Sequence, residues 1–159
     1  LGNLPGGEAV ALYQEFLQAE IDFRNVRNAL RLARSGADID PGAYFIDGGR
    51  LFSASEMTTL VENTDELVAR IRESRYGTKL SEPLDELEAA DSLIDFERAL
   101  EGVLLRYSKQ LGNVHPLSIC PVVAYILMKE REVTNIRAIA RGREAGLSET
   151  AIEQELVIL

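Results

Sequence analysis

The fold is decided by residues 16–36, FLQAEIDFRNVRNALRLARSG, which return 110 positions later as residues 126–146, ILMKEREVTNIRAIARGREAG. The two stretches share six identities over 21 positions, where random pairing gives roughly one or two. The identical pairs are Leu17 and Leu127, Glu20 and Glu130, Asn25 and Asn135, Arg27 and Arg137, Arg31 and Arg141, and Gly36 and Gly146. Apolar residues recur every three or four positions in both stretches, which is typical of α-helices. We therefore predict two long helices that are copies of one another.

The rest of the chain has the same spacing, without long two-residue alternation. We expect helices at 8–34, from 53, from 64, at 83–109 with an interruption near 91–92, at 118–143 and at 148–157, with a break at 76–81. Gly36 and Gly146 are predicted stops, since glycine readily adopts the left-handed backbone of helix ends. Ser53 with Glu56 is a predicted capping box, and Thr64 and Ser148 are predicted caps. The expected fold class is all-α, a bundle of helical repeats.

Each copy carries a polar stripe beside an apolar arc. At about 100° per residue, one stripe contains Glu20, Arg27 and Arg31, and the other contains Glu130, Arg137 and Arg141. The arcs are Val26, Ala29 and Leu30, and Ile136, Ile139 and Ala140. Asn25 and Asn135 lie at the arc edges, where each amide could satisfy a loop carbonyl or helix end. We interpret these Asn and Arg residues as structural contacts, with partner docking on the arginine stripe as the alternative.

The charge and hydropathy of the chain exclude several classes of function. Lysine and arginine number 17 against 26 acidic residues, so the net charge of −9 disfavours nucleic acid as a partner. Only three of the 17 basic residues are lysines, which indicates a protein adapted to high salt; a GC-rich genome with a solvated acidic face is the alternative. No apolar run approaches the roughly 18 residues of a membrane span. The first residues lack the pattern of a signal peptide.

No constellation in the sequence predicts catalysis, a metal or a cofactor. His115 and Cys120 are the only imidazole and thiol, too few for a zinc site, and Cys120 opens an apolar helix where a free thiol usually packs as a small core residue. The sequence GGR at 48–50 lacks the spacing of a phosphate-binding loop and is interpreted as a turn.

A DNA-binding helix-turn-helix is the second class to weigh, because AGLS at 145–148 lies between two predicted helices. The recognition helix would carry Glu149, Glu153 and Glu155 and no basic residue. Such a helix would repel phosphates, so this interpretation is disfavoured.

Parts of this sequence resemble one known protein family. The segment HPLSICPVVAYILMKEREVTNIRAIARGREAGLS at 115–148 is similar to the carboxy-terminal signature of the C subunit of the archaeal and bacterial A/V-type ATPases, which is related to the d subunit of the eukaryotic V-type ATPase. Upstream, Glu20, NVR at 25–27, GGRL at 48–51 and RYG at 75–77 resemble the preceding repeat of that family. Cys120 departs from the small residue, such as glycine, that the family usually carries.

The resemblance implies a non-catalytic part of a rotor. The family's protein is a funnel of three helical repeats that seats the central shaft on one side and rests on the membrane proteolipid ring on the other, coupling ATP synthesis or hydrolysis to ion transport. We assign residues 1–112 to the middle repeat and 113–159 to the start of the carboxy-terminal repeat, with the amino-terminal repeat expected to be absent. The implied location is the cytoplasmic face of the cell membrane, reached through the complex.

Two further expectations accompany this assignment. A stand-alone helical adaptor is the alternative function. The predicted helix at 118–143 carries more apolar surface than one short following helix can bury, so we expect the chain to self-associate, as a symmetric dimer, through this region.

Overall fold

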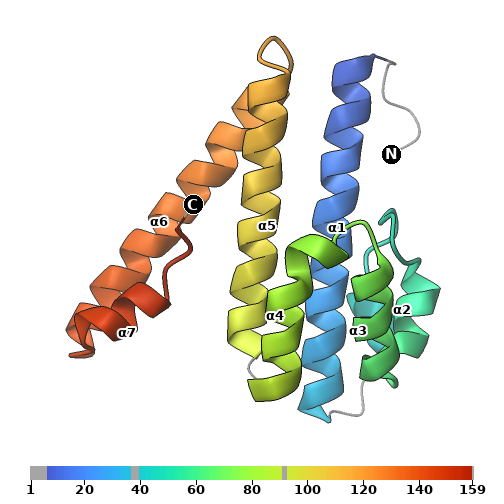
Figure 1. Cartoon of the computed structure of the whole chain (residues 1–159), viewed down its shortest axis with the longest axis horizontal. Helices are drawn as coiled ribbons and strands as arrows, with labels where there is room; N and C mark the ends of the chain where they lie inside the picture. Colours follow the sequence, from blue (N-terminus) through green and yellow to red (C-terminus); the bar gives the residue numbers. More distant parts are fainter. Residues whose placement is uncertain (1–6, 37–39, 91–92, 159) are drawn as a thin grey trace. The chain divides into compact units, whose positions relative to one another are not determined.

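The structure, a computed structural model, describes residues 7–36, 40–90 and 93–158. Within these ranges the chain forms seven α-helices and one 3-10 helix, without a β-strand, so the all-α prediction is confirmed (Figure 1). Contacts divide the chain into a first unit, residues 1–103, and a second unit, residues 104–159. The division falls inside a helix, nine residues before the repeat boundary expected at 112, and the assignment of the units to particular family repeats stays a prediction.

The first unit is organised around helix α1, Glu8–Ser35. Its buried side chains include Phe16, Phe23 and Val26, which recur at helical spacing and form the centre of the core. The helix ends at Gly36 as predicted, with the left-handed backbone at φ 58° that glycine adopts without steric cost. Within this unit, α2, α3 and α4 gather around the carboxy-terminal half of α1 (Figure 1).

A folded loop follows α1 and contains the 3-10 helix η1, Pro41–Tyr44, capped by the Asp40 side chain. Helix α2, Ala54–Leu60, begins with the predicted capping box of Ser53 and Glu56. The predicted cap at Thr64 is wrong by one residue. Asn63 caps α3, Thr64–Glu73, because its carboxamide oxygen accepts from the Glu66 amide.

Helix α4, Gly77–Ala90, begins inside the break expected at 76–81, and Pro83 lies within it instead of opening a helix. The start depends on glycine, since a Cβ at Gly77 would lie 1.9 Å from the Arg72 carbonyl oxygen. The interruption expected near 91–92 lies outside the described residues. Helix α5, Leu93–Val114, contributes its first half to the first unit and its second half to the second.

The second unit contains the end of α5, helix α6, Cys120–Glu144, and helix α7, Glu149–Gln154. The turn between α6 and α7 has the predicted signals: Gly146 is left-handed at φ 72°, and the Ser148 hydroxyl caps α7. Helix α7 lies against α6 at Gly142, where an added Cβ would come within 2.6 Å of Ile152 Cγ1. Helix α7 ends three residues before the expected Val157, which is nevertheless buried.

Candidate functional site

Asn25 of α1 is a buried clamp on the loop after η1. Its Nδ2 donates to the Ile46 carbonyl at 2.8 Å, and its Oδ1 accepts from the Ile46 amide at 2.9 Å. One side chain thus pairs with both polar backbone groups of one loop residue, as a neighbouring β-strand would. The carboxamide of Asn25 supplies the loop partner that the sequence suggested.

Asn135 of α6 makes the same clamp in the second copy. Its Nδ2 donates to the Val157 carbonyl at 2.9 Å, and its Oδ1 accepts from the Val157 amide at 3.3 Å. The clamped residue lies 21 positions after Asn25 and 22 positions after Asn135. The aligned asparagines therefore have equivalent partners, which supports the internal duplication.

Asp22 holds the same loop as Asn25, although it was not among the site residues predicted from the sequence. It is buried, and its Oδ1 accepts from the Arg50 amide at 2.8 Å and the Leu51 amide at 3.0 Å. Burial raises the pKa of Asp22, and the two amides, with the charge of Arg50, partly oppose that rise. Gly49 makes the approach possible, because a Cβ there would lie 2.4 Å from Asp22 Oδ1.

A signal for this contact was present in the sequence: an aspartate next to Phe23 on an otherwise apolar arc, followed by two glycines at 48–49. The residue aligned with Asp22 is Glu132, which is exposed and accepts from Lys129 at 2.6 Å. The second copy therefore keeps the asparagine clamp without the buried carboxylate.

Arg27 and Arg31, from the predicted polar stripe of α1, face acidic residues on α5. Arg31 forms a two-pronged pair with Glu97, and Arg27 approaches Glu101 with 3.8 Å between nitrogen and oxygen. The two hydrogen bonds that Arg31 donates to the Glu97 carboxylate raise the pKa of Arg31. These pairs join α1 antiparallel to the first half of α5, all within the first unit.

Glu20, the acidic member of that stripe, pairs with Arg24 one turn later at 2.6 Å. Arg24 aligns with Thr134, which cannot form an ion pair and donates its hydroxyl to the Glu130 carbonyl. The two stripes, although aligned in sequence, therefore differ in their local ion pairs.

Arg137 and Arg141 occupy the corresponding stripe of α6 and are exposed. Among the described residues the structure gives neither side chain an ion pair, in contrast to Arg27 and Arg31. Glu130 beside them is also exposed. Docking of a partner on this stripe stays a prediction.

The remaining candidates do not form a site in the part of the chain that the structure describes. Cys120 is buried and free, and no cluster of three or more His, Cys, Asp or Glu residues is placed to hold a metal ion there. Gly48 has φ 103°, in keeping with a turn at 48–50. No described helix combines the length and apolarity needed to cross a membrane.

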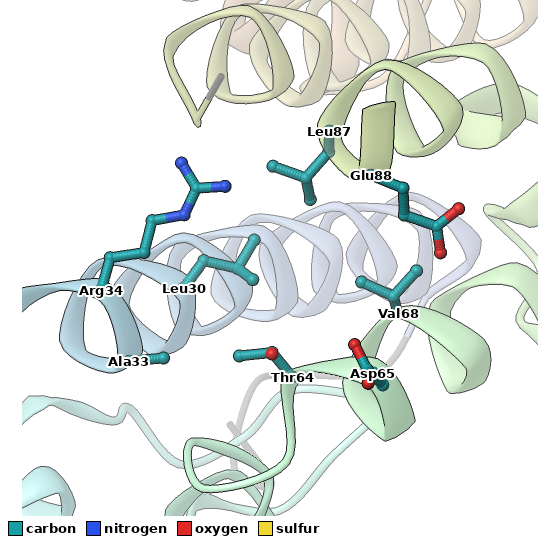
Figure 2. A pocket seen from close by; sticks show the side chains of 8 residues that line it. All are labelled: Leu30, Ala33, Arg34, Thr64, Asp65, Val68, Leu87 and Glu88. Carbon is teal, nitrogen blue, oxygen red and sulfur yellow. The ribbon is translucent and has the colours of Figure 1, made fainter. Parts of the chain in front are cut away.

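A shallow pocket of about 430 Å³ lies in the first unit among α1, α3 and α4 (Figure 2). Leu30, Val68 and Leu87 supply apolar side chains to its lining, and Arg34, Asp65 and Glu88 supply charged ones. Glu88 accepts from Arg72 at 2.7 Å. The described lining contains neither an imidazole nor a thiol.

Comparison with known proteins identifies the family of the chain. The family model described as ATP synthase (C/AC39) subunit matches residues 3–155. The chain belongs to this family. The recognition made from the motifs at 115–148 is thereby confirmed.

Relatives within this ATP synthase family cover nearly all of the chain. The A-type ATP synthase C subunit of Haloquadratum walsbyi is 66% identical over 99% of the chain, and that of Haloferax volcanii is 65% identical over all of it. That of Methanosarcina barkeri is 32% identical over 93%. The chain spans less than half the length of these relatives: 45%, 46% and 41% respectively. No solved structure matches the chain.

Proposed function

We propose that this chain acts as part of a non-catalytic central-stalk component of an A-type ATP synthase, seated between the central shaft and the membrane proteolipid ring. The observation that carries the proposal is the family match over residues 3–155, together with relatives that are named as C subunits of A-type ATP synthases. In this role the chain transmits torque between ATP chemistry and ion transport performed in other subunits.

The contacts of the repeated helices support a mechanical role. A coupling element must resist deformation, and the first unit ties its long loop to α1 with backbone contacts from both Asp22 and Asn25. Ion pairs of Arg27 and Arg31 then tie α1 to α5. These bonds link segments distant in sequence, which limits local opening of the loop and of the helix pair.

The chain would lie at the cytoplasmic face of the cell membrane as a peripheral component of the complex. In isolation we expect it to self-associate through the exposed apolar side chains of α6, as a symmetric dimer. Sedimentation over a concentration series tests the dimer, and a monomer at high micromolar concentration would contradict it. A stand-alone helical adaptor remains the second candidate function.

A chimaera tests the proposal against the adaptor. The matching segment of the Haloferax volcanii protein is replaced by these 159 residues, and the synthase is purified through another of its subunits. We expect the chimaera to assemble and to retain ATP synthesis, since 65% of the residues are unchanged. A chimaera that is expressed and folded but absent from the purified complex would refute the stalk assignment.

The negative control is a chimaera in which Asn25 and Asn135 are both alanine. It removes both loop clamps while leaving the exposed arginines in place.

A separate expectation concerns the isolated chain, which should show no ATP hydrolysis.

A further inference from the structure

The internal duplication shows which face of α6 lacks a cover. The side chains that build the buried face of α1, namely Phe16, Phe23 and Val26, align with Ile126, Val133 and Ile136 of α6. Val26 is 1% exposed and Ile136 is 56% exposed; Phe23 is 6% exposed and Val133 is 46% exposed. The second copy has kept the apolar character of these positions but not their burial.

The first unit also shows what lies along the arginine stripe of such a helix. The first half of α5 lies antiparallel to α1, and its apolar residues Phe96, Leu100 and Val103 are buried. Beside them, Glu97 and Glu101 lie one helical turn apart and meet Arg31 and Arg27. The neighbour of α1 along its arginine stripe is therefore an amphipathic helix with an apolar stripe and two flanking carboxylates at i and i+4.

Helix α6 carries the groups that would match such a helix, namely two arginines beside an apolar stripe. Arg137 and Arg141 are also one turn apart, at the positions of Arg27 and Arg31, and they lie beside Ile126 and Val133 at helical spacing. Both guanidinium groups are exposed and lack an ion pair among the described residues, so they are available to a partner.

We propose that the face of α6 formed by Ile126, Val133, Ile136, Arg137 and Arg141 docks an acidic amphipathic helix from polypeptide outside these 159 residues. The helix lies antiparallel to α6 and places two carboxylates one turn apart against the two arginines, as α5 does against α1. This inference rests on the internal duplication alone, so it stands whether or not the chain works in a central stalk.

A second copy of the chain, which we expect on this face only when the chain is isolated, is a poorer occupant than an acidic helix. Two α6 faces packed on each other would bring the same unpaired arginines into one interface, and each copy carries a net charge of −9. An acidic helix neutralises the arginines while it covers the apolar side chains.

The probe is a fluorescent, end-blocked peptide of residues 93–107, LIDFERALEGVLLRY, titrated with the whole chain and followed by anisotropy. We expect saturable binding. The double variant Arg137→Gln and Arg141→Gln should bind about tenfold more weakly, and Ile136→Gln should also weaken binding. Residue 136 is exposed, so this substitution leaves the fold intact, which circular dichroism checks.

Three controls keep the result specific. Arg70→Gln removes one positive charge from α3 and should leave binding unchanged. A peptide with Glu97→Gln and Glu101→Gln should bind the unmodified chain weakly. Its affinity should fall little further when the chain carries Arg137→Gln and Arg141→Gln, because the peptide substitutions have already removed the same ion pairs. If the peptide instead displaced the chain's own α5 from α1, its affinity would fall in the Arg27→Gln variant and would be unchanged in the α6 variants.

Binding that ignores Arg137 and Arg141, or that follows Arg27 instead, would overturn the proposal. So would a dimer that depends on Ile136 and persists at saturating peptide, since a second copy would then be the occupant. Loss of binding in both the arginine and the Ile136 variants, with an unchanged Arg70 variant, is the supporting result.

Discussion

Replacing Asn25 by alanine tests whether the loop clamp stabilises the first unit. The substitution removes the two hydrogen bonds to Ile46, and a hydrogen bond contributes about 0.5–1.5 kcal/mol net. Asn25 is 1% exposed, so its loss also leaves a small void in the core. We expect the free energy of unfolding to fall by about 2–3 kcal/mol.

Asn28→Ala is the matched control, because it makes the same chemical change three residues later on the same helix. Asn28 is only half-buried and donates a single hydrogen bond, at 2.9 Å, to the Tyr44 carbonyl. The gain in helix propensity from asparagine to alanine is common to both variants and cancels in the comparison. We expect Asn28→Ala to cost less than about 1 kcal/mol.

Urea unfolding gives the two free energies, and amide hydrogen exchange gives their local origin. In Asn25→Ala the Ile46 amide should exchange faster, while the Val157 amide, held by Asn135, should be unaffected. Equal urea midpoints for the two variants, or an Ile46 amide that stays protected, would refute the reasoning.

Three further predictions concern the turn before α7, the Asp22 carboxyl and the net charge of the chain. Gly142→Ala should destabilise the second unit by about 1–3 kcal/mol and speed amide exchange in α7, because its methyl would crowd Ile152; an unchanged α7 would show that the turn yields freely. Because the pKa of Asp22 is raised in the folded protein, the folded state keeps the Asp22 proton up to a higher pH than the unfolded state does. The free energy of unfolding should therefore fall as the pH rises from about 3.8, the ordinary pKa of this carboxyl, through its pKa in the folded protein. Asp22→Asn should remove this part of the pH dependence in thermal melts, and parallel curves for the two proteins would contradict it. Because the chain carries 26 acidic residues against 17 basic ones, its melting temperature should rise with KCl concentration as repulsion is screened; a flat or falling response would disprove the high-salt interpretation.

The sequence predicted features that depend on local chemistry. The stops at Gly36 and Gly146, the capping box at Ser53 and the cap at Ser148 need only a few neighbouring residues, and all four are present in the structure. The cap of α3 was misplaced because Asn63 and Thr64 are both good capping residues, and nothing local decides between them.

Features that depend on distant partners were harder to predict. Periodicity alone did not distinguish buried Val26 from exposed Ile136, because burial depends on which elements pack against each copy. The exposure on α6 was expected only from the small size of the helix that follows it. The partners of Arg27 and Arg31 lie some 70 residues away on α5, beyond the reach of periodicity. The asparagines were recognisable as loop contacts only because two aligned copies carried them.

Both asparagine clamps bind main-chain atoms, so neither depends on the side chain of the residue that it holds. Isoleucine at 46 and valine at 157 could be replaced by most other residues without losing a clamp bond. Proline is excluded, because it has no amide hydrogen to donate. A segment held in this way can change its surface chemistry over evolutionary time while its path stays fixed. The same freedom makes the loop around Ile46 a suitable place to insert an epitope or a reporter dye, with the asparagine keeping the graft in register.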